Sequence, residues 1–489
     1  MKLTKKSKVT LVELPPTQFG ILNGDIGYDV YSAFRLPSRA TPTLEAILRE
    51  DKWENVKSIN PMYHGDKGKL TSDNFKNIFD SDVLLVSSIT RTSPQSMELI
   101  RQYKQAKKDG IVIVGGFDPT FRYEAWLKFA DIIVMGEGEA TLKELMNRLT
   151  QDTKNLDDIA GIAYKNRDEI IVTKKRKLLT PDELSRLPLP YYDESVRKGV
   201  RQAVVETSRG CPFNCDHCTV TEFYGTKHRI KSSERVIDEI KHVKDMGKSL
   251  FFTDDNFAGN TNYAKELLKR IIEEDINNRF MSAQVSVAAA FNKELMGLFK
   301  KAGIKAVYVG FESNNDATLD GYGKPFNWKQ NQEAAKIFKE YGFWVHGMMM
   351  PGGKGDTPES LREMLEWAKK NLDSVQFFPP CPLPGSKLYE QLKKEGRILT
   401  EDYSLYDAQH VIINPQNNFT PFELQTTVYD MYKDFYSPKE FLYRLMNNQN
   451  KKLHSFFFTY INLLGGKKKI LEAPQSLEHL GYLKNLKCN

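Results

Sequence analysis

Residues 204–220 read VVETSRGCPFNCDHCTV, and they place Cys211, Cys215 and Cys218 in a CxxxCxxC spacing directly after an apolar run. Thiolates are ligands that suit both iron–sulfur clusters and zinc. A structural zinc site closes with four protein ligands, commonly as two paired hooks, and this segment has three thiolates and no second hook. A cubane cluster held by three cysteines leaves one iron open to a small molecule. The spacing therefore favours a 4Fe–4S cluster.

A closed zinc site is the alternative interpretation of the same segment. His217 lies inside the motif and His228 follows it, so either imidazole could complete a Cys₃His set. The two interpretations differ in their consequences. A closed site holds its metal for structure alone, whereas an open iron can bind a small molecule and pass an electron to it.

The composition is that of a globular protein in a reducing compartment. The chain has 489 residues, a formal net charge of +7 and five cysteines. Its length predicts two or three domains, and its charge is too mild to indicate a partner made of nucleic acid. Cys381 and Cys488 stand apart from the motif, which argues against a disulfide framework. We expect Cys381 to be a small apolar residue and Cys488 to be inert.

Apolar segments near both ends of the chain are too short for export or for crossing a membrane. The first is interrupted by Glu13 and Pro15, which indicates a strand and not a signal peptide. The run 456–464 is about half as long as a membrane-spanning helix needs to be. We therefore expect a cytoplasmic protein without a transmembrane segment.

From Gln202 onward, strand and helix patterns alternate as they do in a parallel β/α barrel. The expected strands are 203–207, 249–253, 280–287, 306–311, 343–350 and 374–379, and the expected helices are 234–246, 263–274, 293–302, 328–341, 358–371 and 387–394. Six such units predict a partial (β/α)6 barrel whose functional groups gather at the carboxyl ends of the strands. The cysteine motif follows the first of these strands.

The first part of the chain also alternates strands and helices. Strands are expected at 8–14, 55–60, 82–89, 111–114 and 131–135, with helices at 94–108 and 140–149. This order is typical of an α/β, doubly wound parallel sheet, whose ligands lie beyond the carboxyl ends of the strands. Small, turn-forming and acidic residues follow three successive strands there, at Ser87, Ser88, Thr90, Gly115, Gly116, Gly136, Glu137, Gly138 and Glu139. Tight turns alone could explain each loop, but three together favour a large flat ligand.

The remaining segments complete the expected domain organisation. Residues 158–178 predict a β-hairpin centred on 166–168, and the proline-containing stretch after it has no period and is interpreted as a linker. The chain after about residue 400 is helical, aromatic and rich in lysine. The expected domains are 1–155 (doubly wound sheet), 156–200 (hairpin and linker), 201–398 (barrel) and 399–489 (helical C-terminal cap).

The three-cysteine spacing at the end of the first barrel strand resembles the radical S-adenosylmethionine (SAM) superfamily. This resemblance implies that SAM binds the open iron through its amino and carboxylate groups. One electron from the reduced cluster then cleaves SAM to methionine and a 5′-deoxyadenosyl radical, which abstracts hydrogen from an inert carbon. An external one-electron donor such as flavodoxin or ferredoxin is implied as a partner.

Further residues match the elements that hold SAM in this superfamily. The second barrel strand ends in FFTDDNF and the fourth runs AVYVGFES, which places acidic groups at the barrel mouth. The resemblance assigns SAM binding to His217, Asp254, Asp255, Asn256, Ser286 and Glu312. The residue that controls the substrate radical is unknown from the sequence, although Tyr308, Tyr322 and His346 are candidates for substitution.

The order of the domains resembles radical SAM enzymes that carry an N-terminal cobalamin-binding domain. The match includes SSxT…PQ, GGxxPT, GEGE, LPxPYYD and LPGSKLYEQL. It implies that the three loops of the first domain hold cobalamin. The chain lacks the DxHxxG motif that supplies an axial histidine in many cobalamin proteins, and Asp118 stands where related loops often carry histidine.

Three functions follow as hypotheses. The first is cobalamin-dependent methylation of an unactivated carbon. The second is cobalamin-independent radical chemistry on a lipid or isoprenoid, for which residues 439–469 mix aromatics with lysines and could lie on a membrane surface. The third is a binding module with a structural cluster, which would leave the acidic groups at the barrel mouth without a use.

Overall fold

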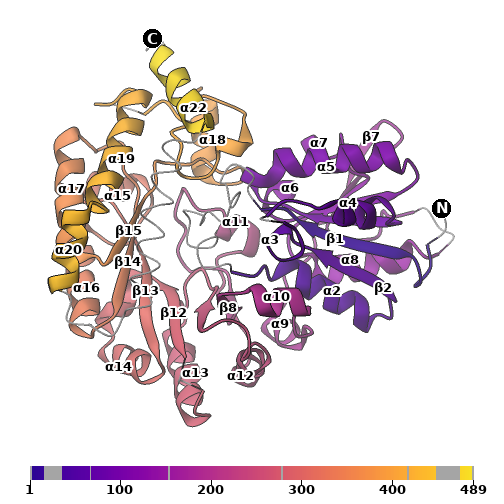
Figure 1. Ribbon diagram of the computed structural model, residues 1–489, viewed down its shortest axis with the longest axis horizontal. Helices are drawn as coiled ribbons and strands as arrows, with labels where there is room; N and C mark the ends of the chain where they lie inside the picture. The colour runs from indigo at the N-terminus through magenta and orange to yellow at the C-terminus, as the bar shows by residue number, and fades with distance from the viewer. Residues whose placement is uncertain are drawn as a thin grey trace. The chain divides into compact units, whose positions relative to one another are not determined.

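The computed structural model describes residues 3–15, 36–66, 68–151, 155–276, 279–415, 418–447 and 474–486 (Figure 1). The chain divides into two compact units. The first contains the N-terminal strand and Pro37–Val200, with the short piece Asp402–Ser404, and the second contains Leu36, Arg201–Glu401 and the chain from Leu405 onward.

A sheet forms the centre of the first unit. Its described strands lie in the order β2-β1-β3-β4-β5-β6-β7. Their bounds are β1 (Lys8–Glu13), β2 (Asn55–Ile59), β3 (Val83–Ser87), β4 (Ile111–Gly115), β5 (Ile132–Val134), β6 (Ile162–Asn166) and β7 (Glu169–Val172). Strands β1 to β5 are parallel, and β6 and β7 are antiparallel additions at one edge. The predicted parallel sheet is confirmed.

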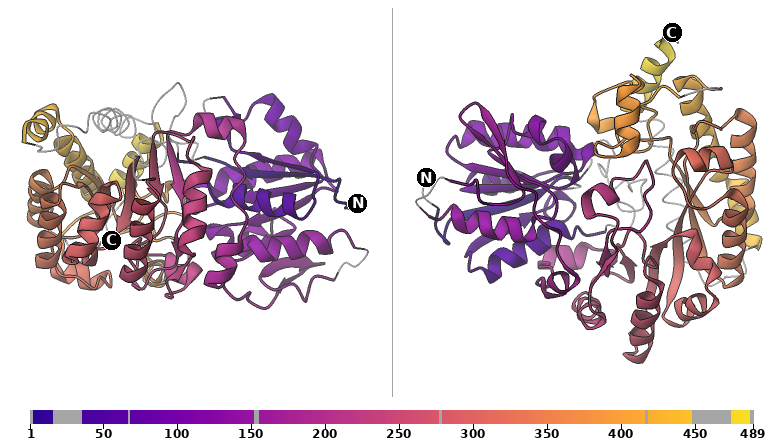
Figure 2. Two further views of the ribbon diagram at one scale, coloured as in Figure 1. Left: turned by 90° about the horizontal axis from the view of Figure 1, so that it is seen from below. Right: turned by 180° about the vertical axis from the view of Figure 1, so that it is seen from behind.

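Helices cover both faces of this sheet, because alternate strand residues point to opposite sides (Figures 1 and 2). Leu11 and Val83 pack with α2 (Ala40–Glu50) and α8 (Gly138–Arg148). Their neighbours Val12 and Leu84 pack on the other side, with residues of α4 (Ser72–Phe79), α5 (Ser93–Ala106) and α7 (Tyr123–Trp126). The buried strands therefore read as continuous apolar runs, as expected for a doubly wound sheet.

The segment between the two expected domains is more ordered than the sequence indicates. The hairpin β6–β7 belongs to the first sheet, with Arg167 at a φ of 57° in its turn. The stretch interpreted as a linker forms two short helices, α9 (Pro181–Arg186) and α10 (Glu194–Gly199). Thr180 and Asp193 cap them. Helices of six residues are too short to show a hydrophobic period, so only their capping residues mark them.

The second unit contains a parallel sheet whose described strands lie in the order β15-β14-β13-β12-β11-β8. Their bounds are β8 (Gln202–Val205), β11 (Ser249–Phe252), β12 (Phe280–Val285), β13 (Ile304–Glu312), β14 (Trp344–Met349) and β15 (Ser374–Phe377). The intervening helices include α12 (Ser233–His242), α13 (Thr261–Glu273), α14 (Lys293–Lys301), α15 (Asp316–Gly321), α16 (Trp328–Glu340), α17 (Pro358–Asn371) and α18 (Lys387–Lys394). The predicted partial barrel is confirmed.

Local capping explains why these helices begin where they do. Each of α12 to α18 is preceded by a Ser, Thr or Asn whose side chain accepts a hydrogen bond from a backbone N–H of the first turn. The capping residues are Ser232, Asn260, Asn292, Asn315, Asn327, Thr357 and Ser386. These polar residues lie between apolar strands and amphipathic helices, so the sequence places the element boundaries well.

The C-terminal part closes the open edge of the barrel sheet. The backbone N–H of Val375 donates to the Tyr436 hydroxyl at 3.0 Å, and that of Phe377 donates to the Tyr432 hydroxyl at 2.8 Å. Tyr432 lies on α19 (Pro421–Phe435), and Tyr436 caps its end. An edge strand otherwise leaves such groups unpaired. The helix therefore replaces a seventh strand with side-chain hydroxyls.

The end of the chain includes α20 (Pro438–Asn447) and α22 (Pro474–Asn485). Residues 448–473, which carry most of the aromatic and lysine-rich stretch considered for membrane contact, lie outside the described residues, as does Cys488. Within the part that the structure describes, no helix combines the length and apolar character needed to cross a bilayer.

Candidate functional site

The three motif cysteines lie on one loop after β8 and the short strand β9 (Ser208–Arg209). Cys211, Cys215 and Cys218 are free thiols that influence one another's ionisation. Burial raises the pKa of all three, that of Cys218 to about 12. The backbone N–H of Val220 points at the Cys218 sulfur at 3.4 Å, which supports a thiolate there. Three thiols gathered on one loop are a donor set that fits an iron–sulfur cluster.

The two histidines that could complete a zinc site pack against different parts of the chain. The His217 ring packs edge-on against Tyr322, with centroids 5.8 Å apart, and the His228 ring lies against Gly259. Burial lowers the pKa of His217. Among the described residues, no three or more His, Cys, Asp and Glu side chains are arranged to hold a single metal ion.

Asp254 braces the strand that leads to the cysteines. Its carboxylate accepts hydrogen bonds from the Thr207 N–H at 3.2 Å, the Thr207 hydroxyl at 2.7 Å and the Ser208 hydroxyl. The side chain is buried, and burial raises its pKa to about 6. The sequence expectation assigned SAM binding to this residue, and the structure gives its oxygens three donors from the neighbouring strand.

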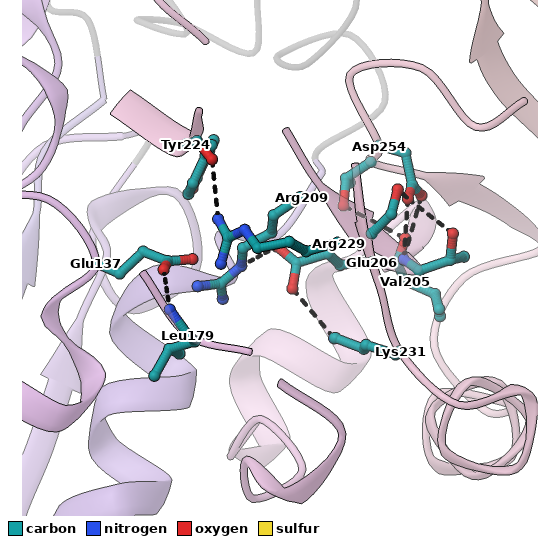
Figure 3. A network of polar contacts seen from close by, with 12 residues as sticks. Glu137, Leu179, Val205, Glu206, Arg209, Tyr224, Arg229, Lys231 and Asp254 are labelled. Carbon is teal, nitrogen blue, oxygen red and sulfur yellow. Dashed lines mark hydrogen bonds and ion pairs between the residues drawn. The ribbon is translucent and has the colours of Figure 1, made fainter. Parts of the chain in front are cut away.

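A buried charge network continues this brace (Figure 3). Glu206 pairs with Arg209 at 3.1 Å and with Lys231 at 3.1 Å, and Lys231 also pairs with Glu239 at 2.8 Å. Lys231 is only 2% exposed. It follows β10 (Arg229–Ile230), which is antiparallel to β9. A buried lysine must keep its carboxylate partners, so the network holds the backbone on both sides of the cysteine loop in one arrangement.

Asp255 differs from its neighbour in its surroundings. It is half-buried, and burial together with Asp254 and Glu206 raises its pKa to about 7. Next to it, Asn256 accepts a hydrogen bond from the Ser286 N–H at 3.3 Å. The structure thus brings three expected SAM-binding residues, Asp255, Asn256 and Ser286, together at the carboxyl ends of β11 and β12.

Glu312 lies at a strained end of β13. Its φ is +62°, a conformation that L-residues other than Gly, Asn and Asp seldom adopt, and the pairing with β14 shifts register between Gly310 and Glu312. A Cβ on Gly310 would collide with the Glu312 carboxylate. The Met350 N–H donates to the Glu312 carbonyl at 2.6 Å. The neighbouring strands therefore hold the Glu312 backbone in a conformation that is unfavourable for a glutamate, and such strain is typical of functional sites.

Lys324 is a residue that sequence reasoning missed. Its Nζ lies 3.0 Å from Glu312 Oε1, and the two side chains are 15% and 10% exposed. Although burial acts to lower it, Glu312 and Cys215 raise the pKa of Lys324, so the side chain is a cation. The sequence shows only a lysine in the loop DGYGKPFN, with no motif to mark it. Its role emerges from proximity to the cysteine loop.

The inner face of the barrel carries polar and aromatic groups below this rim. The Tyr308 ring lies 5.4 Å from Phe251 and 5.0 Å from His346, centroid to centroid. His346 hydrogen-bonds Ser374 at 2.7 Å and Gln376 at 3.2 Å. Tyr308 and His346 are thus neighbours, whereas Tyr322 packs beside His217. Cys381 is half-buried and follows β15.

In the first unit, the loops expected to hold cobalamin meet along one sheet edge, because β3, β4 and β5 are neighbours. The Ser88 N–H donates to the Gly115 carbonyl at 3.0 Å, and a Cβ on Gly116 would come within 2.5 Å of the Ser88 carbonyl. Ser87 ends β3, and Thr90 is buried in the turn that follows. Position 116 therefore requires glycine, because the two neighbouring loops pack too closely there to admit a Cβ.

The last of these loops is more open. Gly136 has a φ of +73°, and a Cβ placed on it would meet nothing within 4 Å. The carboxylate of Glu137 accepts a hydrogen bond from the Leu179 N–H at 2.8 Å, and Gly138 and Glu139 begin α8. This edge offers bare backbone at Gly136, as the close approach of a large flat group requires. The residues present therefore fit a cobalamin-type ligand.

Asp118 lies within the second of these loops and has structural partners. Its carboxylate accepts a hydrogen bond from Trp126 Nε1 at 2.7 Å and pairs with Arg122 at 3.1 Å. Arg122 in turn stacks on Tyr403, 3.3 Å from the ring centroid. Burial raises the pKa of Asp118, and both partners offset this effect.

Comparison with known protein families identifies both units. The radical SAM superfamily model matches residues 205–368, and the B12-binding domain model matches residues 33–146. The first match contains the cysteine loop and most of the barrel, and the second contains the three loops described above.

Two relatives match this chain over most of their length. A Pyrococcus horikoshii protein named uncharacterized methyltransferase PH0819 is 29% identical over 448 residues, covering 88% of this chain and 93% of that protein. The bacteriochlorophyllide d C-8(2)-methyltransferase of Chlorobaculum tepidum is 26% identical, covering 77% of this chain and 82% of that protein.

Solved structures share the fold. The cobalamin-dependent SAM radical enzyme OxsB, with aqua-cobalamin and SAM bound, superposes with a TM-score of 0.68 at 18% identity over 94% of this chain and 72% of that one. The methyltransferase TsrM from Kitasatospora setae, with cobalamin and a 4Fe–4S cluster bound, has a TM-score of 0.63 at 17% identity, covering 80% and 75%. The chain therefore contains a B12-binding domain followed by a radical SAM domain, and the cofactors of these two domains are cobalamin and a 4Fe–4S cluster with SAM.

Proposed function

We propose that this enzyme is a cobalamin-dependent radical SAM methyltransferase that methylates an unactivated carbon. The observation that carries the proposal is the presence of a B12-binding domain and a radical SAM domain in one chain. The two relatives described above, which match over most of their length, are both named as methyltransferases.

In this proposal Cys211, Cys215 and Cys218 hold the cluster. When bound, the 4Fe–4S cluster supplies the electron that cleaves SAM to methionine and a 5′-deoxyadenosyl radical, and methylcobalamin supplies the methyl group. The cysteine thiols must lose their protons to become ligands, and their burial makes this costly without a metal. Loading of the cluster should therefore release protons and stabilise the loop.

The mouth of the barrel supplies the groups that bind SAM. Asp255 offers a carboxylate to the SAM ammonium, while Asn256 and Ser286 keep the adjoining strand ends in register. Glu312 offers a second carboxylate toward ribose hydroxyls, and His217 offers an aromatic face near the adenine. Asp254 supports the SAM site indirectly. Its carboxylate oxygens already accept hydrogen bonds from Thr207 and Ser208, so it positions the backbone before the cysteine loop.

The edge of the first unit holds the corrinoid in this proposal. The bare backbone at Gly136 allows the macrocycle to approach, and Glu137, which is fastened to Leu179, keeps the loop in place. The polar hydroxyls of Ser88 and Thr90 line the neighbouring loop. The tight packing of Gly116 on Ser88 holds the first two of these loops together.

An external one-electron donor of the flavodoxin or ferredoxin type completes the reaction. A cluster with an open iron is damaged by oxygen, so we place the enzyme in an anaerobic cytoplasm. The substrate is a small molecule or lipid that reaches the barrel interior beside Tyr308 and His346.

Anaerobic reconstitution with iron, sulfide and hydroxocobalamin tests the proposal. The loaded protein should show corrinoid absorbance and should release methionine and 5′-deoxyadenosine from SAM under dithionite. Cys211→Ala, Cys215→Ala and Cys218→Ala should each lose iron, whereas Cys381→Ala should keep it. A protein that binds no corrinoid and turns over without cobalamin contradicts methyl transfer from cobalamin.

A further inference from the structure

The segment 322–326 runs along the cysteine loop and holds it at several points. The Asp216 N–H donates to the Tyr322 carbonyl at 3.0 Å, and the Phe213 and Phe326 rings meet edge to face at 5.6 Å. A Cβ on Gly323 would lie 3.3 Å from the Asp216 carboxylate. Lys324 lies within this segment, so these contacts place its backbone next to the cysteine loop.

The charge of Lys324 acts on the cysteine loop from a nearly water-free position. The residue before Lys324, Gly323, lies against Asp216, which stands between Cys215 and Cys218 in the loop. Lys324 Nζ pairs with Glu312 Oε1 at 3.0 Å, which fixes the position of the cation. Because the pair is only 15% and 10% exposed, water screens its field weakly.

A second lysine near the same loop provides a contrast. Lys387 Nζ lies 3.2 Å from the Asp216 carboxylate and 3.4 Å from the Asn214 carbonyl. Its side chain is 47% exposed. The two lysines thus share a loop and a charge, but solvent screens only one of them strongly.

We propose that Lys324 sets the reduction potential of the cluster, and that Glu312 opposes it. Reduction adds one electron from the external donor and breaks no bond, so the cluster gains one unit of negative charge. A fixed cation next to the cysteine loop stabilises that extra charge, and net charge is one of the quantities that sets cluster potentials. The inference rests on the proposed cluster site and adds a residue that tunes it.

The two members of the pair should shift the potential in opposite directions. Lys324→Met removes the cation and leaves Glu312 negative, which disfavours the reduced cluster. Glu312→Gln leaves Lys324 uncompensated, which favours it. Loss of structure alone would not produce shifts of opposite sign.

The experiment is a redox titration of the reconstituted full chain without SAM, followed by electron paramagnetic resonance of the reduced cluster. Lys324→Met should lower the reduced-to-oxidised ratio at a fixed potential about tenfold, which corresponds to about 59 mV for one electron. Glu312→Gln should raise the ratio, Lys324→Arg should keep it near the wild-type value, and Lys387→Met should leave it unchanged.

The outcomes separate this inference from the proposed function. A wild-type protein that binds no iron–sulfur cluster contradicts the proposed function itself. A fully loaded Lys324→Met protein with an unchanged potential overturns the inference, as does an equal shift in Lys387→Met. If Lys324→Met does not load its cluster, Glu312→Gln decides, and an unchanged or lowered potential in that variant overturns the inference.

Discussion

The Thr207 hydroxyl donates a 2.7 Å hydrogen bond to Asp254, and this contact joins the ends of two neighbouring barrel strands just before the cysteine loop. Asp254→Ala removes the acceptor and leaves buried donors unpaired, which should destabilise the protein by about 1–3 kcal/mol. We also expect less iron per chain. Asp255→Asn is the matched control and should keep the iron while weakening SAM binding. Equal iron contents in Asp254→Ala and wild type would contradict the bracing role.

Ionisation of Asp254 should make the stability of the protein depend on pH. Its carboxyl has a pKa of about 6 in the folded chain, because of burial, against 3.8 for an ordinary aspartate. Between these values the folded state binds more protons at Asp254 than the unfolded state does, so the contribution of this residue to stability falls as pH rises through this window and is level above it. The change is about 3 kcal/mol. Urea unfolding of the apo protein between pH 4 and 7 should show it, and Asp254→Asn should reduce the slope.

Gly310 keeps Glu312 in its place. Gly310→Ala introduces a Cβ that collides with the Glu312 carboxylate and should displace it from Lys324. We expect SAM binding, measured by calorimetry on the loaded protein, to weaken at least tenfold. Gly297→Ala is the control, because nothing lies within 4 Å of a Cβ there. It should stabilise the helix by about 0.5–1 kcal/mol and leave binding unchanged.

The tyrosines that cap the sheet edge should contribute measurably to stability. Tyr432→Phe removes the acceptor for the Phe377 N–H and should cost about 1–3 kcal/mol. Hydrogen exchange at Phe377 should accelerate. Tyr482→Phe also removes a hydrogen bond, to the Leu399 carbonyl, but that side chain is 43% exposed, and the loss should be smaller. Equal losses of stability in the two variants would contradict a special role for the buried Tyr432 hydroxyl at the sheet edge.

Corrinoid loading should depend on the bare backbone at Gly136. Gly136→Val adds a side chain where the structure has open space, so it should reduce corrinoid absorbance after reconstitution. Its positive φ makes the substitution cost about 1–2 kcal/mol. Gly116→Val clashes with Ser88 and should destabilise the domain more strongly. A Gly136→Val protein that binds as much corrinoid as wild type contradicts the assigned edge.

Much of the fold could be predicted because its signals are local. Apolar runs mark the strands, and residues such as Asn292 and Thr357 mark helix starts, so the expected and observed elements agree closely. The α9 and α10 helices were missed because six residues show no period. The pairing of the β6–β7 hairpin with β5 was also missed, since a hairpin pattern does not say which sheet it joins.

The sequence alone predicted the three cysteines as cluster ligands and the positions of Asp255 and Glu312 at strand ends, because spacing and alternation are properties of neighbouring residues. Tertiary structure decided what those groups face. In the folded chain Asp254 accepts hydrogen bonds from Thr207 and Ser208, and the segment that contains Lys324, a residue with no motif of its own, lies next to the cysteine loop. Charges act through space and depend on burial, and neither quantity can be read from the order of residues.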